Sequence, residues 1–227
     1  MRKLFVSLVL ASLVATMIGI PVAASQPSTL PKLEKVTFVH YANSSSKPVW
    51  DDTVTDYKLI AGGVKWTSII SYSVNPNESG LDPEVVRSTL EASSETWDNA
   101  TGFELFAAPT ITFESVVSVD RKNTVGWGLL SSGIIAVNQL WYNPATKEIV
   151  EFDVIFNTGY PWGTDNSTNK MDLQNIATHE LGHNGLGDLR SPKDQALTMY
   201  AYSALGETIK RTLGNGDTLG SQKLYGP

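Results

Sequence analysis

The sequence contains no cysteine, which limits both how the chain can be stabilised and how it can bind a metal. An exported domain without disulfides depends on its hydrophobic core and on any ions that it binds. Hydrophobic residues make up 41% of the 227 residues, which suffices for a core of ordinary size. No thiolate is available as a metal ligand, so a metal site must use other side chains.

Runs of basic residues are also missing. The 17 Lys and Arg residues are outnumbered by 23 Asp and Glu residues, and the formal net charge is -6. Proteins that bind nucleic acid usually carry a basic patch or stripe. We therefore expect no nucleic-acid partner.

One long apolar run is present, at the N-terminus. Arg2 and Lys3 precede the nearly uncharged residues 4–20, and the small residues Val22-Ala23-Ala24 follow. This pattern is typical of a secretory signal peptide. We predict a signal peptide over residues 1–24 and a secreted protein without stable membrane association after cleavage. An uncleaved membrane anchor is the alternative, because the run is near the lower limit of about 17 residues for a membrane span.

The composition divides the rest of the chain into two parts. Residues 25–63 are rich in Ser, Pro and Lys and resemble a leader or propeptide, with possible short strands over 35–41 and 57–60. Gly62-Gly63 is a possible hinge. Residues 64–227 have globular patterning, so we expect the main domain there.

Within the main domain the patterns predict strands and helices in mixed order. Asp82 and Pro83 are typical of a helix N-cap and first helical position, and apolar residues recur at helical spacing as far as Asn99. The other predicted helices cover 171–184 and 217–225, and the predicted strands cover 65–74, 111–117, 125–130, 133–142 and 148–157. The last two strands flank a turn and predict a hairpin. The order indicates an α/β (α+β) fold with a mixed twisted sheet.

The second helix carries the pattern His179-Glu180-Leu181-Gly182-His183. Residues four apart on a helix differ by about 40° in direction, so both imidazoles can reach one ion. Glu180 lies close enough to hold a water molecule without binding the metal, which is the H-E-x-x-H arrangement. Two ordinary surface histidines on a helix are the alternative interpretation.

A catalytic zinc usually takes three protein ligands. We predict Asp188 as the third, because the glycines at 185 and 187 would let the chain turn back towards the metal. Asp194 is the second candidate ligand. His40, in the predicted leader, is a poor candidate for a site in the mature protein.

This segment resembles the matrixin-type metallopeptidases of the metzincin clan, which carry H-E-x-x-H-x-x-G-x-x-H, sometimes with Asp as the last ligand, and a downstream Met-turn. Met199 fits the Met-turn, and the resemblance covers roughly residues 57–226. The further matching stretches are Val64-Lys65-Trp66, Ile70-Ser71-Tyr72, the helix ending at Trp97, Phe152 to Asn157, and Leu219 to Gly226. The resemblance implies a metzincin-like fold with an active-site helix and a small helical C-terminal part.

The chain departs from the family pattern near the third ligand. The family spacing would place Gly at Leu186 and the ligand at Leu189, and a one-residue deletion before Gly185 restores Gly185 and Asp188. The histidines of a structural zinc site are absent, so we expect one catalytic zinc only. The cysteine of a propeptide switch is absent too. A latent form would require the leader to block the cleft or to supply a ligand other than a thiol.

These features predict a secreted zinc endopeptidase in which Glu180 is the general base. By resemblance, an extended protein or peptide substrate would pair with an exposed edge at Ile134 to Leu140. Tyr200 and Tyr202 either line the pocket, donate to the oxyanion or simply pack in the core. The alternative functions are a non-catalytic exported zinc-binding surface protein and a zinc amidase acting on cell-wall peptides. We expect a monomer.

A calcium ion is a further possibility for an exported domain without disulfides. Asp153 and Asn157 could bind it, with Asp165 and Asn166 as other oxygen donors. Ordinary turn and loop roles for these residues are slightly favoured.

Overall fold

The structure is a computed structural model that describes residues 32–43 and 48–227. The predicted signal peptide and the alternative membrane anchor lie outside these residues. Within the described part of the chain, no helix is both long and apolar enough to cross a membrane.

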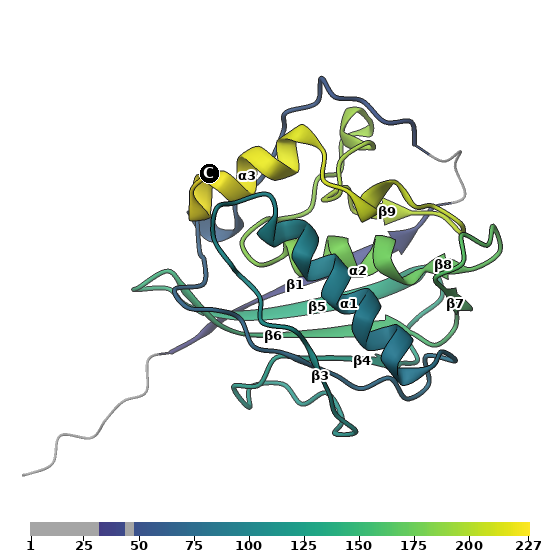
Figure 1. Cartoon of the computed structure of the whole chain (residues 1–227). Coiled ribbons are helices and arrows are strands. Elements are labelled where there is room, and N and C mark those ends of the chain that lie inside the picture. Colours follow the sequence, from purple (N-terminus) through teal and green to yellow (C-terminus); the bar gives the residue numbers. More distant parts are fainter. Residues whose placement is uncertain (1–31, 44–47) are drawn as a thin grey trace, which may run out of the picture. The chain divides into compact units, whose positions relative to one another are not determined.

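A seven-stranded mixed sheet forms the framework (Figure 1). Its strands follow the order β3-β2-β4-β6-β5-β1-β9. They are β1 (Glu34–Ala42), β2 (Ser73–Val74), β3 (Thr110–Ile111), β4 (Thr124–Gly128), β5 (Ile134–Asn143), β6 (Glu148–Asn157) and β9 (Tyr202–Ser203). The pairs from β3 to β6 are parallel, whereas β5 pairs antiparallel with both β6 and β1. Two short strands, β7 (Trp162–Gly163) and β8 (Met171–Asp172), pair separately.

Three α-helices complete the fold: α1 (Pro83–Asp98), α2 (Leu173–Gly182) and α3 (Asn215–Tyr225). The chain also forms short 3-10 turns at Ile60–Gly62, Pro192–Asp194 and Ile209–Arg211. The predicted N-cap of α1 is confirmed, because the Asp82 carboxylate accepts hydrogen bonds from the N–H groups of Glu84 at 2.9 Å and Val85 at 3.2 Å. Helices α1 and α2 lie side by side over one face of the sheet (Figure 1).

The main hydrophobic core lies between these two helices and the sheet. Helix α1 contributes Val86, Leu90 and Trp97, and α2 contributes Leu173, Ile176, Ala177 and Leu181. The Trp97 indole N–H donates to the Thr178 carbonyl at 2.8 Å, which fixes α1 against α2. The helix that carries the candidate site is therefore held rigidly against the sheet.

The predicted fold class is confirmed, including the hairpin of β5 and β6, but several predicted strands are shorter. Of residues 65–74 only β2 joins the sheet as a strand, with single bridges at Lys65 and Ile70. The expected strand over 57–60 contributes one bridge, at Leu59. Residues 111–117 leave the sheet after β3, and the side chains of Phe113 and Val117 are 69% and 53% exposed. Their apolar pattern therefore does not reflect a buried strand.

The strand predicted in the leader is confirmed and joins the sheet as β1. Eight of its residues, from Glu34 to Tyr41, pair antiparallel with β5. The expectation of a free sheet edge at Ile134 to Leu140 is therefore wrong, since β1 covers that edge.

Candidate metal centre

Helix α2 directs two histidines and a neighbouring acid towards one point. Its N-terminus is capped by the Asp172 carboxylate, which accepts from Asn175 N–H at 2.9 Å. His179 and His183 lie one turn apart, with ring centroids separated by 5.1 Å. Oδ1 of Asp188 lies 3.4 Å from Nε2 of His179 and 3.6 Å from Nε2 of His183. The three predicted ligands thus come together in the fold.

Backbone carbonyls fix the orientation of both imidazoles. Nδ1 of His179 lies 2.7 Å from the Thr198 carbonyl, and Nδ1 of His183 lies 2.8 Å from the Leu186 carbonyl. Since a carbonyl can only accept, each Nδ1 carries the proton, and in the neutral ring each Nε2 presents a lone pair towards Asp188. Such carbonyl partners are typical of histidines that bind a metal.

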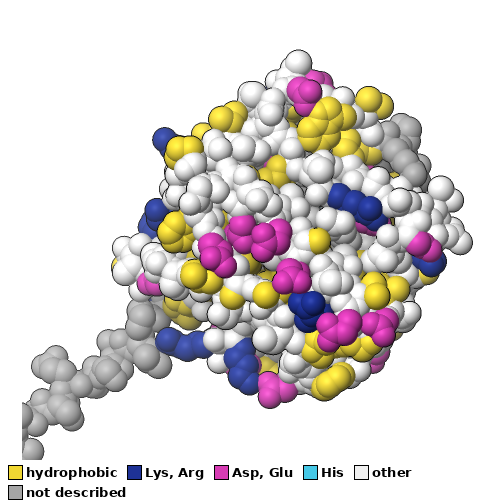
Figure 2. Space-filling view, viewed as in Figure 1, with side chains coloured by type: hydrophobic (Ala, Val, Ile, Leu, Met, Phe, Trp, Pro, Cys, Tyr) yellow, Lys and Arg dark blue, Asp and Glu magenta, His cyan; other side chains and the backbone are white. Residues whose placement is uncertain are grey.

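The atoms that face the centre lack other partners. Nε2 of both histidines and Oδ1 of Asp188 are buried, and none has a hydrogen-bond partner in the described structure. Two nitrogen lone pairs and a carboxylate oxygen that converge without a donor fit a cation, and this donor set suits zinc. No histidine side chain is visible on the face drawn in Figure 2, as expected from their burial.

The electrostatics of the site favour the metal-binding protonation states of His183 and Asp188. For His179, burial lowers the pKa, but the contacts with Asp188 and Glu180 outweigh this effect and raise it. Burial lowers the pKa of His183 to about 4, which keeps the ring neutral. Burial opposes ionisation of Asp188, but the close approach of the His179 and His183 imidazoles and of the Arg190 guanidinium outweighs this effect and lowers its pKa. A neutral imidazole and an ionised carboxylate are the forms that bind zinc.

Glu180 lies beside this centre but is not one of the three converging groups. Its side chain is buried, and burial raises its pKa to about 8 while the charge of His179 partly opposes the shift. Oε1 lies 3.0 Å from Nδ1 of His40, and Oε2 has no hydrogen-bond partner in the described structure. The carboxyl group can therefore accept and return a proton near the centre.

The segment after α2 brings Asp188 to the histidines through close backbone packing. Leu186 N–H donates to the Gly182 carbonyl at 3.1 Å, and Leu189 N–H donates to the Met199 carbonyl at 2.9 Å. The chain turns back to the histidines as expected, but neither Gly185 nor Gly187 has a positive φ, so a left-handed glycine is not the reason. Gly185 instead provides space: a Cβ atom there would overlap Leu224 Cδ1 and lie 3.1 Å from the Val64 carbonyl oxygen.

Met199 packs against Gly182 of α2, and its backbone N–H is held by a buried acid. Asp217 accepts hydrogen bonds from the N–H groups of Thr198 at 2.7 Å, Met199 at 3.0 Å and Gly214 at 2.9 Å. The Thr198 carbonyl in turn accepts from His179. Asp217 therefore positions the segment that orients a candidate ligand.

The family comparison agrees with this geometry. The family model described as matrixin, in the M10 peptidases, matches residues 65–226, which include both histidines, Glu180 and Asp188. The chain belongs to the matrixin family. No individually characterised protein matches the sequence closely enough to be counted as a relative. As a matrixin, the chain is a member of a zinc metallopeptidase family, for which proteins or peptides are the expected substrates.

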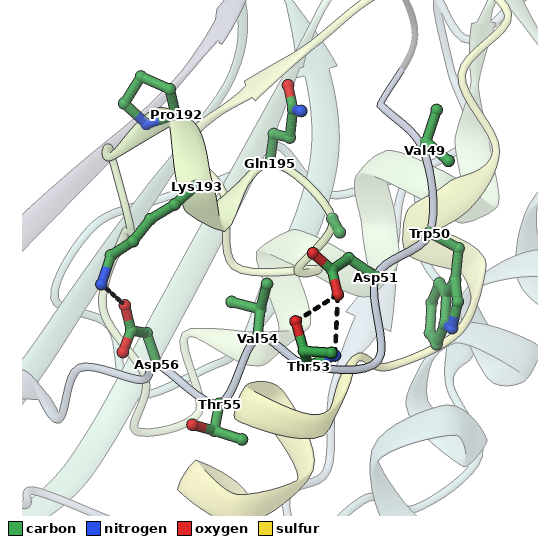
Figure 3. Close-up of a pocket in the computed structure, with 11 residues that line it drawn as sticks. Val49, Trp50, Asp51, Thr53, Val54, Thr55, Asp56, Pro192, Lys193 and Gln195 are labelled. Carbon is green, nitrogen blue, oxygen red and sulfur yellow. Dashed lines mark hydrogen bonds and ion pairs between the residues drawn. The ribbon is translucent and has the colours of Figure 1, made fainter.

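The second candidate ligand, Asp194, lies away from this matrixin centre. It belongs to the turn Pro192–Asp194, and its carboxyl group interacts with Asp56. A hollow of about 560 Å³ opens beside it, lined by residues of 49–56 and 192–196 (Figure 3). Lys193 pairs with Asp56 at its rim, at 2.5 Å. None of the four candidate site residues lines this hollow.

Two of the four possible calcium ligands, Asn157 and Asp165, are engaged elsewhere, whereas Oδ2 of the buried Asp153 has no hydrogen-bond partner in the described structure. The side-chain Oδ1 of Asn157 accepts from Leu130 N–H at 3.1 Å and Gly159 N–H at 2.8 Å, and its side-chain Nδ2 donates to the Ile134 carbonyl at 2.6 Å. Asp165 pairs with Lys170. Within residues 32–43 and 48–227, the histidine and acid groups close enough to share an ion are His179–His183–Asp188 and His40–His179–Glu180. Asn157 thus anchors the loop before β5.

The two tyrosines that follow Met199 are half-buried. Their rings lie 5.3 Å apart, and Tyr202 also lies 6.0 Å from the ring of Tyr41 in β1. Tyr202 begins β9, which pairs with β1. The two rings therefore pack against each other, and Tyr202 also packs against β1.

Sequence reasoning missed two residues from the leader that reach the site. His40 contacts Glu180, and the Phe38 ring stacks on His183 at 3.8 Å between centroids. That His40 is a poor candidate for a site in the mature protein stays a prediction, but β1 places this residue beside α2 in the full chain. The alternation of Val36, Phe38 and His40 along one strand was the available signal.

Proposed function

We propose that this matrixin is a zinc-dependent endopeptidase in which His179, His183 and Asp188 bind one catalytic zinc. Glu180 is the general base. The observation that supports the proposal best is the convergence of three buried, unpartnered ligand atoms next to a buried carboxyl group. A purely structural zinc site has no need of such an acid.

The chemistry divides between the metal and the protein. A zinc ion at this centre would activate water and polarise the scissile carbonyl group. Glu180 takes a proton from the attacking water and delivers it to the nitrogen of the departing amine, so that one water is added across the peptide bond. Oε2 of Glu180 is buried and has no hydrogen-bond partner in the described structure, so this oxygen is able to accept that proton.

The test combines zinc analysis with hydrolysis of casein and a quenched peptide library. The assay uses the natural chain and a chain with His40→Ala, because His40 contacts Glu180 in the structure. In either background, Glu180→Ala should keep the zinc and lower hydrolysis by about 10²–10⁴-fold. Glu84→Ala, at a side chain that is 70% exposed, is the matched control and should change neither quantity.

Three results would contradict the proposal. Hydrolysis that survives Glu180→Ala would remove this residue from the mechanism. Stoichiometric zinc without turnover in any form would favour an exported zinc-binding surface protein. Faster cleavage of cell-wall peptides than of proteins would indicate the amidase instead.

We also propose that the protein is secreted, on the basis of the signal-like pattern of residues 1–24. When the chain is expressed, we expect it in the culture medium, with Ser25 as the N-terminal residue by protein sequencing. Retention of Met1 in a membrane fraction would support the anchor instead.

A further inference from the structure

A small cavity lies between the end of α2 and the sheet. Its volume of about 10 Å³ is close to the lower limit for holding one water molecule. Apolar side chains form half of its lining: Phe106, Phe152 of β6 and Leu181 of α2, each at most 5% exposed. A cavity with only such a lining would stay dry. The other side chains of the lining therefore decide what the cavity can contain.

Three residues with polar atoms complete the lining: Trp66, Glu180 and Asn184. Each has at least one buried polar atom that lacks a hydrogen-bond partner among the residues that the structure describes. These atoms are Nε1 of Trp66, Oε2 of Glu180, and both Oδ1 and Nδ2 of Asn184. Buried polar groups without any partner are unfavourable, so in folded proteins they are usually paired with protein or with ordered water. Four such atoms on the residues around one cavity indicate a shared partner inside it.

Tyr225, at the end of α3, fixes the backbone of two of these residues. Its hydroxyl group accepts from the Trp66 backbone N–H at 3.1 Å and donates to the Asn184 carbonyl at 2.7 Å. The Asn184 N–H also donates to the Leu181 carbonyl at 3.1 Å, which tightens the chain at the end of α2. Both side chains are therefore held at the cavity by contacts that do not depend on its contents.

The three polar groups match the hydrogen-bonding capacity of one water molecule. The indole N–H of Trp66 can only donate, and an ionised Glu180 carboxylate can only accept. A water molecule can accept from Trp66 and donate one proton to Oε2 of Glu180 and the other to Oδ1 of Asn184. That gives the total of about three hydrogen bonds that is usual for a buried water. Each carboxylate oxygen has two acceptor positions, so Oε2 keeps one for the attacking water.

We propose that this cavity binds one ordered water molecule, which connects Asn184 and Trp66 to the general base Glu180. Asn184 is then a positioning residue, because through this water it holds the Glu180 carboxyl group in the orientation that receives the proton. This inference rests on the proposed peptidase function. A metal ion does not suit the cavity, because the indole N–H of Trp66 is no ligand and only two side chains with oxygen atoms remain.

Water-selective NMR of the full chain tests the site directly. A water molecule that stays in the cavity should give a rotating-frame Overhauser signal to the indole N–H of Trp66. Trp66→Phe keeps an aromatic ring but removes this N–H, and so identifies its resonance among those of the 6 tryptophans. Asn184→Leu replaces the amide with methyl groups of similar size and should abolish the signal. Circular dichroism confirms the fold of each variant.

Peptide hydrolysis is the second readout, in the natural chain and in the chain with His40→Ala. Asn184→Leu should lower kcat by about tenfold, as expected for one lost hydrogen bond to a charged group, with KM and zinc content unchanged. Asn184→Ser keeps a hydroxyl group for the water and should recover most of this loss, and Trp66→Phe should lower kcat less. Ser221→Ala is the matched control: it removes a buried hydroxyl group, also unpartnered in the described chain, from a residue of α3 outside this lining, and should change neither readout.

The outcomes distinguish this inference from the peptidase function. No Overhauser signal at Trp66 in the natural chain would overturn the water site. An unchanged kcat in Asn184→Leu would overturn the positioning role while leaving the peptidase function intact. A fall in kcat that Asn184→Ser does not recover, or that Ser221→Ala shares, would indicate a general effect on the fold and would overturn that role too. If no form hydrolyses peptides, the peptidase function itself is wrong, and the positioning role is overturned with it.

Discussion

Asp217→Asn provides a demanding test of how the fold supports the metal centre. The carboxylate is 1% exposed and accepts three backbone N–H groups: Oδ2 takes those of Thr198 and Gly214, and Oδ1 takes that of Met199. Burial raises the pKa of Asp217, and the hydrogen bonds from these backbone groups oppose the rise. Asparagine has nearly the same shape but only one acceptor oxygen.

The magnitude follows from the donor that asparagine cannot satisfy. If the amide oxygen takes the position of Oδ2, the new NH₂ group faces the N–H of Met199, and one buried donor is left without an acceptor. Such a group costs about 1–3 kcal/mol, and the lost hydrogen bond adds to it, so we expect about 3 kcal/mol of destabilisation. For a domain of this size that corresponds to a fall in Tm of about 6–12 °C.

The assay is thermal unfolding followed by circular dichroism, together with zinc competition. Zinc affinity should also fall, because Thr198 orients His179 through its carbonyl. Asp165→Asn makes the same chemical change at an exposed residue paired with Lys170, and it should shift the free energy of unfolding by less than about 0.5 kcal/mol. If Asp217→Asn has the same Tm as Asp165→Asn, the structural role assigned to Asp217 is wrong.

Three further predictions concern packing, pH and substrate choice. Gly182→Ala should destabilise the fold by about 2 kcal/mol in chemical denaturation, because the added methyl group would overlap Met199 Sδ and Trp97 Cζ2. A Cβ atom at Gly187 would have its nearest neighbour at 3.5 Å, so Gly187→Ala should leave the free energy of unfolding unchanged. Equal destabilisation by the two variants would contradict this packing argument. Burial first, and then the charge of Glu151, raise the pKa of Asp153 to about 7. The folded state therefore binds more protons than the unfolded state between about pH 4 and 7, and the free energy of unfolding should decrease as the pH rises through that range. Asp153→Asn should remove this pH dependence from melting curves, and an unchanged pH profile would refute the assignment. In the chain with His40→Ala, the space vacated beside Oγ of Ser203 should favour substrates with hydrogen-bonding side chains such as His, Asn or Gln over Leu in peptide-library cleavage, and a preference for Leu would contradict a polar substrate pocket there.

Local signals in the sequence were sufficient for the helices and for the pair of histidines. Asp82 and Pro83 begin α1 as expected, and the four-residue spacing of His179 and His183 places both rings on one side of α2. Asp188 could be anticipated because it lies only five residues after His183. These features depend on contacts within a short stretch of chain.

The remaining features depend on contacts between distant segments. His40 meets Glu180 across 140 positions, and Asp217 meets Thr198 across 19. No periodicity in residues 34–42 shows which strand edge they will cover. The apolar pattern of 111–117 was misleading for the same reason, since its side chains find no partner layer after Ile111.

Zinc content after replacement of each candidate acid tests the central claim most directly. The account predicts one zinc per purified natural chain by mass spectrometry, and zinc affinity lowered by at least about 10-fold in Asp188→Ala, since a lost ligand should weaken binding at least as much as a lost supporting partner. Asp194→Ala, whose carboxyl group lies by Asp56, should bind zinc as the natural chain does. Full zinc retention in Asp188→Ala, or loss in Asp194→Ala, would contradict the proposed centre of His179, His183 and Asp188.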